Sequence, residues 1–161
     1  MSQAIISDSS SLIMAARLGR LDLLSNLFQQ IHVPQRVRQE IMAKEDAAIH
    51  VLLENPTFTV VATTNHSLLA LLDGTLDYGE AEAVALAQEK QWLLLIDEKK
   101  GRKIAKNMGL KIIGLLGVLL LNHRRGHILK TEAIDLLAQL KQMGFRLSVT
   151  LENDFLLQLQ R

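Results

Sequence analysis

Two aspartates follow short apolar runs of the kind that form buried strands. Asp8 comes directly after Ala4-Ile5-Ile6-Ser7, and Asp97 directly after Trp92-Leu93-Leu94-Leu95-Ile96. In an open parallel sheet, ligands bind in the crevice outside the carboxyl ends of the strands. Carboxylate oxygens are the ligands that magnesium and manganese prefer. The pattern therefore predicts a site for hard cations, with a helix N-cap for Asp8 and a turn role for Asp97 as the alternatives.

Two glutamates are further candidates for this site. Glu80 opens a helical segment in which the residues three, four and seven positions on are apolar, namely Ala83, Val84 and Ala87. Glu80 therefore heads a buried stripe, where an unpaired charge is costly and needs a metal ion or a salt bridge. Glu40 lies at the edge of an apolar stripe in another predicted helix. A solvated boundary residue is the alternative for Glu40.

Three polar residues neighbour these acids. Ser10, two residues after Asp8, could donate a hydrogen bond that orients the carboxylate, or could cap the following helix. Glu98 adjoins Asp97, but successive side chains of a strand point to opposite faces, so we expect only Asp97 to face the crevice. Glu82 aligns with a mixed polar and apolar helix face and is not assigned to the site.

Basic side chains gather after Asp97, although the net charge of the chain is only +1. They are Lys99, Lys100, Arg102, Lys103 and Lys106, followed further on by Arg124 and Arg125. A solvated helix face explains either cluster by itself. Beside an acidic pocket, however, a basic border could hold a phosphate backbone, and we assign Lys99, Lys100, Arg102 and Arg124 to that role.

Several other kinds of site are excluded. The chain has no cysteine, which excludes disulfides and thiolate chemistry and is typical of a reducing cytoplasm. It has no phosphate-binding P-loop and no nucleophile elbow. His123 and His127 are four residues apart, but Gly126 and the expected helix end lie between them, so a zinc site is not expected. The start lacks the features of a signal peptide, and the apolar run 112–121 is shorter than the roughly 20 residues that cross a bilayer. We expect a cytoplasmic protein without membrane association.

Strands that alternate with helices predict an α/β fold with a mostly parallel sheet in one domain, residues 1–161. The expected strands cover residues 4–8, 31–33, 58–61, 92–96 and 111–113. The expected helices cover residues 9–18, 21–30, 35–54, 67–72, 79–91, 99–108, 115–124 and 131–143. The tail from Gly144 is interpreted as a short extended piece and a terminal helix.

The order of these motifs resembles that of PIN-domain proteins, most closely the small prokaryotic PIN-like proteins related to toxin nucleases. The resemblance begins with Ile6-Ser7-Asp8-Ser9-Ser10 and with Val33-Pro34 leading to Glu40-Ile41. It continues through Leu76-Asp77-Tyr78-Gly79-Glu80-Ala81-Glu82-Ala83 and Leu95-Ile96-Asp97-Glu98-Lys99-Lys100-Gly101-Arg102. Gly109-Leu110, Ile113-Gly114, Gly117-Val118-Leu119 and Gly144-Phe145-Arg146 extend it over nearly the whole chain.

The resemblance implies a three-layer α/β/α fold and magnesium- or manganese-dependent cleavage of RNA. Carried over residue by residue, the catalytic and metal-binding acids are Asp8, Glu40, Glu80 and Asp97, with Ser10 as the small polar companion of the first aspartate. The resemblance also implies a homodimer and, for a toxin, an antitoxin partner. An apolar surplus at 115–121 and in the tail supports an interface. The alternatives are a catalytically silent PIN-like module that binds RNA or protein, and a structure-specific DNA nuclease.

Overall fold

The computed structural model describes residues 4–44 and 46–161. Its five strands are β1 (Ala4–Ser7), β2 (Gln30–Pro34), β3 (Phe58–Val61), β4 (Leu93–Leu95) and β5 (Ile112–Ile113). They form one parallel sheet in the order β3-β2-β1-β4-β5. The order runs in one direction from β1 to β3 and in the other from β4 to β5, so it reverses between β1 and β4. This reversal is where open α/β sheets bind ligands.

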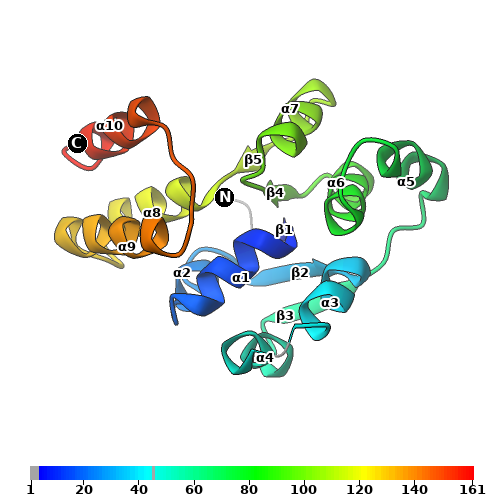
Figure 1. Cartoon of the computed structure of the whole chain (residues 1–161), viewed down its shortest axis with the longest axis horizontal. Coiled ribbons are helices and arrows are strands. Elements are labelled where there is room, and N and C mark those ends of the chain that lie inside the picture. Colours follow the sequence, from blue (N-terminus) through cyan, green and yellow to red (C-terminus); the bar gives the residue numbers. More distant parts are fainter. Residues whose placement is uncertain (1–3, 45) are drawn as a thin grey trace.

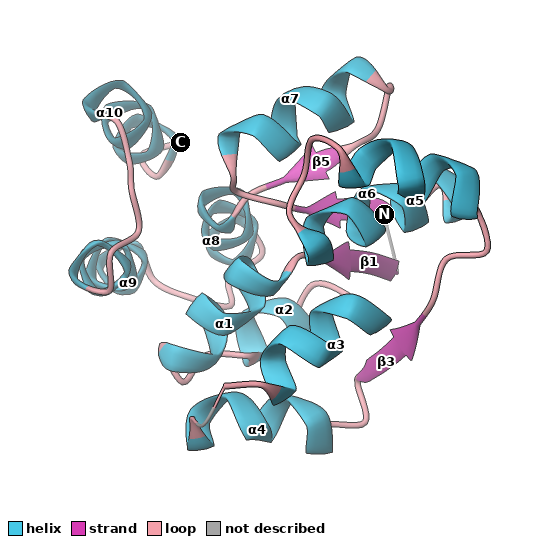
Figure 2. Cartoon of the chain, turned by 45° about the vertical axis from the view of Figure 1, so that its right-hand side comes forward, coloured by secondary structure: helices cyan, strands magenta, loops and turns pink. Residues whose placement is uncertain are grey.

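Helices cover both faces of the sheet (Figure 1). They are α1 (Ser9–Arg17), α2 (Asp22–Ser25), α3 (Gln35–Met42), α4 (Ala47–Glu54), α5 (His66–Asp73), α6 (Tyr78–Lys90), α7 (Lys99–Asn107), α8 (Leu115–Arg124), α9 (Lys130–Gln142) and α10 (Val149–Gln158). Figure 2 shows α1 and α3 on one side of the strands and α6 and α7 on the other. The three-layer α/β/α prediction is confirmed.

Alternation along the strands divides the core into two apolar clusters. Ile5 and Leu95 face a cluster built from α1 to α4 and α8 to α10, whereas Ile6 and Leu94 face one built from α5, α6 and α7. Successive strand residues point to opposite faces, so each strand contributes to both clusters. All four side chains are fully buried. The sheet is therefore held from both sides, which keeps its carboxyl edge rigid.

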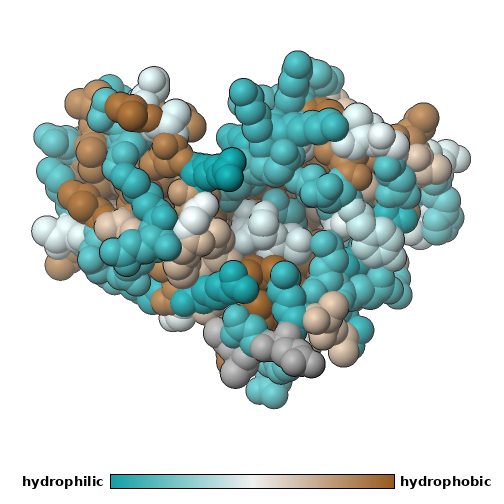
Figure 3. Space-filling view, viewed as in Figure 1, coloured by the Kyte–Doolittle hydropathy of each residue, from teal (hydrophilic) through white to brown (hydrophobic). Residues whose placement is uncertain are grey.

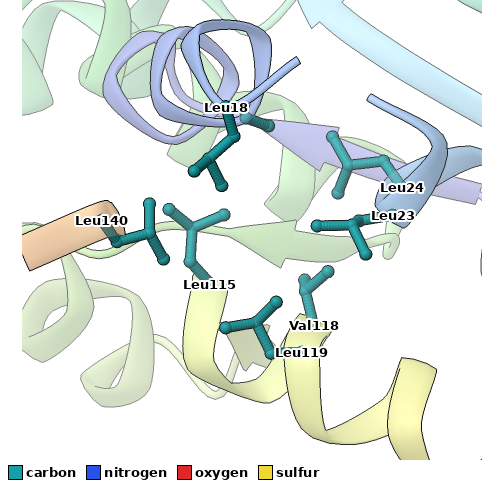
Figure 4. A pocket seen from close by; sticks show the side chains of 8 residues that line it. Leu18, Leu23, Leu24, Leu115, Val118, Leu119 and Leu140 are labelled. Carbon is teal, nitrogen blue, oxygen red and sulfur yellow. The ribbon is translucent and has the colours of Figure 1, made fainter. Parts of the chain in front are cut away.

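The apolar cluster that contains α8 encloses a small cavity (Figure 4). Its lining consists of Ala15, Leu18, Leu23, Leu24, Leu115, Val118, Leu119 and Leu140. The labelled side chains point toward one another from α8, α9 and the segments around α1 and α2. A cavity with this lining has no polar group for orienting a ligand, so it is a packing feature of the core.

Two predicted helices are wrong in extent. The predicted helix 21–30 is helical only in α2, because the chain must turn at Phe28 to enter β2. The predicted helix 35–54 divides into α3 and α4. Ile41 and Ile49 are both buried, whereas one continuous helix would place them about 80° apart around its axis. The break allows both to reach the core.

The apolar run 112–121 forms β5 and the first turns of α8, as the prediction of a buried strand–helix junction requires. Leu115, Val118 and Leu119 are buried, so this run gives little support to an interface. The tail forms α10, in which Val149 and Leu157 are exposed, unlike the buried residues of α8. Within the described residues, the structure has no helix of the length and apolar character that a membrane span needs.

Candidate metal and active site

Asp8 lies at the point where β1 passes into α1. It is 1% exposed, and its N–H donates to the Leu95 carbonyl at 3.1 Å, which ties β1 to β4 beyond the last paired residues. One carboxylate oxygen accepts from the Ser11 N–H at 3.0 Å, as in a helix N-cap, and the other from the Ser10 hydroxyl at 3.3 Å. The cap and the crevice roles are thus compatible. The cap fixes the carboxylate at the strand end.

Asp97 follows β4 on the other side of the strand-order reversal. Both of its carboxylate oxygens lie 3.2 Å from the Leu115 N–H at the start of α8. The Leu115 side chain packs in the apolar cavity, so core packing positions the donor that holds Asp97. The neighbouring Glu98 has another task, because it is exposed and caps α7 by accepting from the Gly101 N–H at 2.8 Å.

Ser11 joins the two aspartates. Its N–H bonds to Asp8, and its hydroxyl donates to Asp97 Oδ2 at 2.9 Å. Ser11 is buried, whereas Ser10 is exposed. In the sequence analysis Ser10 is assigned to the site and Ser11 has no part in it. The missed signal is the spacing, because a residue three positions after an N-cap presents its N–H to the capping side chain.

Glu80 lies in the first turn of α6 and is 8% exposed. A Cβ added to Gly101 in α7 would stand 3.2 Å from Glu80 Oε2, so the glycine makes room for this carboxylate. Burial, as the largest cause, and the nearby charges of Glu98 and Asp8 together raise the pKa of Glu80 to about 7. Glu80 and Asp8 therefore share one electrostatic environment.

Glu40, in α3, lies against the start of α6. A Cβ on Gly79 would overlap Glu40 Oε1, and this buried oxygen has no hydrogen-bond partner in the described part of the chain. Burial raises the pKa of Glu40, and the charge of Asp77 adds to the effect. The Gly79 N–H and the Ser9 hydroxyl act in the opposite direction. Glu40 thus lies next to Ser9, which follows Asp8 in the sequence, and next to Gly79, which precedes Glu80.

Burial also raises the pKa values of the two aspartates. It raises the pKa of Asp8 to about 6, with a contribution from the charge of Asp97, while the bonds from Ser11 oppose the shift. Burial raises the pKa of Asp97 against the opposing effect of the Ser11 hydroxyl, the Leu115 N–H and the charge of Arg102. Buried, mutually repelling carboxylates disfavour the empty ionised state and favour protonation or a cation.

The basic residues differ in how they meet the site. Lys99 and Lys100 are exposed in the first turn of α7, and Figure 3 shows hydrophilic side chains over α7 at the top of that view. Arg102 instead turns inward and donates to the Ile96 carbonyl at 2.7 Å. It lies beside Asp97, so Arg102 serves as an internal counter-charge.

Arg124 lies at the other end of α8 from the acids. Leu115 begins the helix beside Asp97, and Arg124 follows nine residues later, about 14 Å along the axis. Its guanidinium donates to Gln158 of α10. The structure therefore does not bring Arg124 to the acidic site, whereas it does bring Lys99 and Lys100 near.

Glu82 is buried but serves the framework. Its two carboxylate oxygens accept from the Arg36 N–H at 2.8 Å and from the Thr63 N–H at 3.3 Å. It thereby holds the start of α3 and the segment after β3 against α6. Although Glu82 is on a face that mixes polar and apolar residues, it is only 4% exposed.

His32 lies in the middle of β2 and is paired in register with Ile6 of β1. Its ring stacks on Trp92 with 4.0 Å between centroids. Both ring nitrogens are buried, and neither has a hydrogen-bond partner among the described residues. Burial lowers the pKa of His32, with a smaller effect from the charge of Lys90. It is a neutral core residue.

A family model for the PIN domain matches residues 4–161, which is nearly the whole chain. The chain belongs to the PIN-domain family. None of the curated proteins matches the chain at a significant level. PIN domains have a nuclease-type fold, bind nucleic acid and generally use divalent metal ions.

The donor set of this PIN domain suits a hard divalent cation. All four acids offer oxygen ligands, and Glu40 Oε1 is a buried oxygen without a partner. Even so, in residues 4–44 and 46–161 no three His, Cys, Asp or Glu side chains form a group that could hold a metal ion as they stand. Asp8 and Asp97 are instead held by serine and backbone donors. An ion held by these acids would require their side chains to move toward one another.

Proposed function

We propose that this PIN-domain protein is a magnesium- or manganese-dependent endoribonuclease whose ligands are Asp8, Glu40, Glu80 and Asp97. One observation carries the proposal. Asp8 and Asp97 meet across the reversal of strand order and share Ser11 as a donor. The raised pKa values of the acids support it, because a cation offsets both the burial and the repulsion that raise them.

The side chains then have separate tasks. Bound divalent ions would activate a water and stabilise the leaving oxygen of an in-line displacement. Ser11 and the Leu115 N–H orient Asp97, and Ser10 with Ser11 orients Asp8. Lys99 and Lys100 attract the phosphates of the RNA, while Arg102 offsets part of the negative charge beside Asp97.

A catalytically silent module that binds RNA or protein is the second candidate. It is favoured by one observation, the lack of a ready group of three ligands among the described residues. A binding module nevertheless has no use for four buried or half-buried carboxylates with raised pKa values. Burying carboxylates costs free energy, and the nuclease has a use for them that the silent module lacks, so the nuclease is favoured.

The proposal includes a homodimer and the role of a toxin with an antitoxin partner. The dimer is supported by α10, which leaves Val149, Leu151 and Leu157 more than half exposed. Sedimentation of the wild type and of Leu157→Gln tests the dimer. Co-expression with the product of an adjacent small gene tests the toxin role, since an antitoxin restores growth that the nuclease arrests.

The decisive experiment compares three proteins on a mixed RNA pool with Mn²⁺. They are the wild type, Asp97→Asn and a control, Asp154→Asn, which removes an exposed carboxylate of α10. We expect cleavage by the wild type and the control, and none by Asp97→Asn. A parallel arm with single-stranded DNA identifies a DNA nuclease. Equal cleavage by all three, or none by the wild type across several RNAs, contradicts the nuclease assignment.

Calorimetric titration with Mn²⁺ separates the two candidates without a substrate. The nuclease requires Mn²⁺ binding that Asp97→Asn abolishes and Asp154→Asn retains. Binding by none of the three proteins favours the silent module.

A further inference from the structure

Tyr78 is an exposed aromatic residue at the border of the acidic site. It is the only tyrosine of the chain, it begins α6 two residues before Glu80, and it is 52% exposed. The neighbouring Gly79 contacts Glu40. The ring therefore lies along the seam of α3 and α6, against Arg36 and Gln39, and the next residue, Gly79, packs on Glu40. Its exposure has no explanation in the packing of the core.

The ring is held in a defined orientation. The guanidinium carbon of Arg36 stands 4.2 Å from the ring centroid, which is a cation–π contact. The Tyr78 hydroxyl donates to Gln39 Oε1 at 2.9 Å. Arg36 is itself fixed, because its two terminal nitrogens donate to the two carboxylate oxygens of Asp73 at 2.6 and 3.1 Å. A side chain held at one face and at its hydroxyl is ready to bind without further ordering.

We propose that Tyr78, supported by Arg36, is a stacking platform for an unpaired base of single-stranded RNA beside the carboxylates. Stacking of a base on an aromatic side chain is worth roughly 5- to 150-fold in affinity and tolerates any base. Bases become available for stacking when they are unpaired, which points to single strands and loops as the substrate. The proposal rests on the proposed nuclease function and names its substrate class.

The charge pattern supports a base rather than a phosphate at this position. Arg36 is already paired with Asp73, and Glu82 adds another negative charge close by. The Arg36 guanidinium is already engaged by the Asp73 carboxylate, whereas the exposed side chain of Tyr78 offers an apolar surface to a neutral base. The phosphates would instead follow Lys99 and Lys100 on α7. The base would thus bind at α6 and the phosphate backbone at α7.

The test uses a ten-nucleotide single-stranded RNA with one 2-aminopurine, moved along the sequence, and Ca²⁺ in place of Mn²⁺. The proteins are the wild type, Tyr78→Phe, Tyr78→Leu and the control Leu71→Ala, which shortens another exposed apolar residue. We expect quenching at one position with the wild type, Tyr78→Phe and Leu71→Ala, but not with Tyr78→Leu. Tyr78→Leu should bind the RNA about 5- to 100-fold more weakly.

A second RNA lacks the base at the quenched position. It should bind the wild type and Tyr78→Leu equally, because the partner of the ring is gone. If Tyr78→Leu loses the same factor with both RNAs, or binds the intact RNA like the wild type, the platform is refuted. Melting curves show whether Tyr78→Leu folds. If it does not, the comparison of intact and abasic RNA on the wild type and Tyr78→Phe decides.

The two proposals fail in different ways. Cleavage by the wild type together with unchanged binding by Tyr78→Leu refutes the platform and leaves the nuclease. Quenching that depends on Tyr78, without cleavage in Mn²⁺, supports the platform in a silent RNA-binding module. An absence of any RNA binding by the wild type refutes both.

Discussion

The Ser11 hydroxyl donates a 2.9 Å hydrogen bond to Asp97 Oδ2 across 86 positions of sequence. The same residue gives its N–H to Asp8 at 3.0 Å. One serine thus couples the two acids that face each other where the strand order reverses. Removing one of the hydrogen bonds by which Ser11 links Asp8 and Asp97 should therefore have a measurable effect.

Ser11→Ala should weaken Mn²⁺ binding about 10-fold, which is the lower end of the effect of removing a group that orients a metal ligand. The fold should persist, because the backbone N–H that binds Asp8 is retained. Calorimetric titration measures the affinity, and thermal unfolding in EDTA checks the fold. Ser10→Ala is the matched control, since Ser10 is exposed and its bond to Asp8 is 3.3 Å long, and it should change the affinity less. Equal effects of both variants would contradict the coupling.

Gly79→Ala should destabilise the wild type, because the new Cβ would overlap Glu40 Oε1. In a Glu40→Ala background the same change should cost less, since alanine favours a helix more than glycine does and only the Val37 Cγ2 atom, 3.1 Å from the new Cβ, still has to give way. Urea unfolding of the four proteins forms a double-mutant cycle. Additive effects would show that Glu40 does not lie against Gly79.

Glu80 and Glu82 lie two residues apart and should respond oppositely. Glu82→Ala leaves the N–H groups of Arg36 and Thr63 without their partner, at a cost of about 1–3 kcal/mol each where they are buried. Glu80→Gln removes a repelled carboxylate, so the metal-free protein should not lose stability at pH 8 while Mn²⁺ binding falls. Urea unfolding and calorimetry measure the two properties. A large stability loss in Glu80→Gln would assign it a framework role.

Stability without metal should depend on the ionisation of Asp8. Its pKa is raised to about 6 in the folded state from 3.8. A raised carboxyl pKa means that its contribution to stability is fully present below pH 3.8 and is lost as the pH rises through about 6. Glu80 acts in the same direction, up to a pH of about 7.

His32 opposes this trend, because its lowered pKa makes the fold less stable as the pH falls. The informative quantity is therefore the difference between Asp8→Asn and the wild type in EDTA. Asparagine also caps helices, so the variant keeps the cap. The melting temperature of Asp8→Asn minus that of the wild type should increase by on the order of 5 °C between pH 5 and pH 8. A difference that is constant with pH would contradict the raised pKa of Asp8.

The periodic parts of the fold were predictable from sequence. Residues such as Ile5 and Ile6 alternate between two apolar layers, and α6 to α8 follow local patterns and end signals. The errors fell where the chain changes direction. The break after α3 and the short α2 depend on which core position Ile49 and Phe28 must reach, and local propensity does not contain that information.

The sequence by itself determined that Asp8 and Asp97 stand at strand ends and that Glu80 heads a buried stripe, because these facts follow from periodicities of two and 3.6 residues. Only the tertiary structure decided that the two aspartates share Ser11, that Glu82 belongs to the framework and that Arg124 lies far from the acids. Strand order and helix packing set these contacts between distant segments. A local pattern gives the face of an element but not the neighbour it meets.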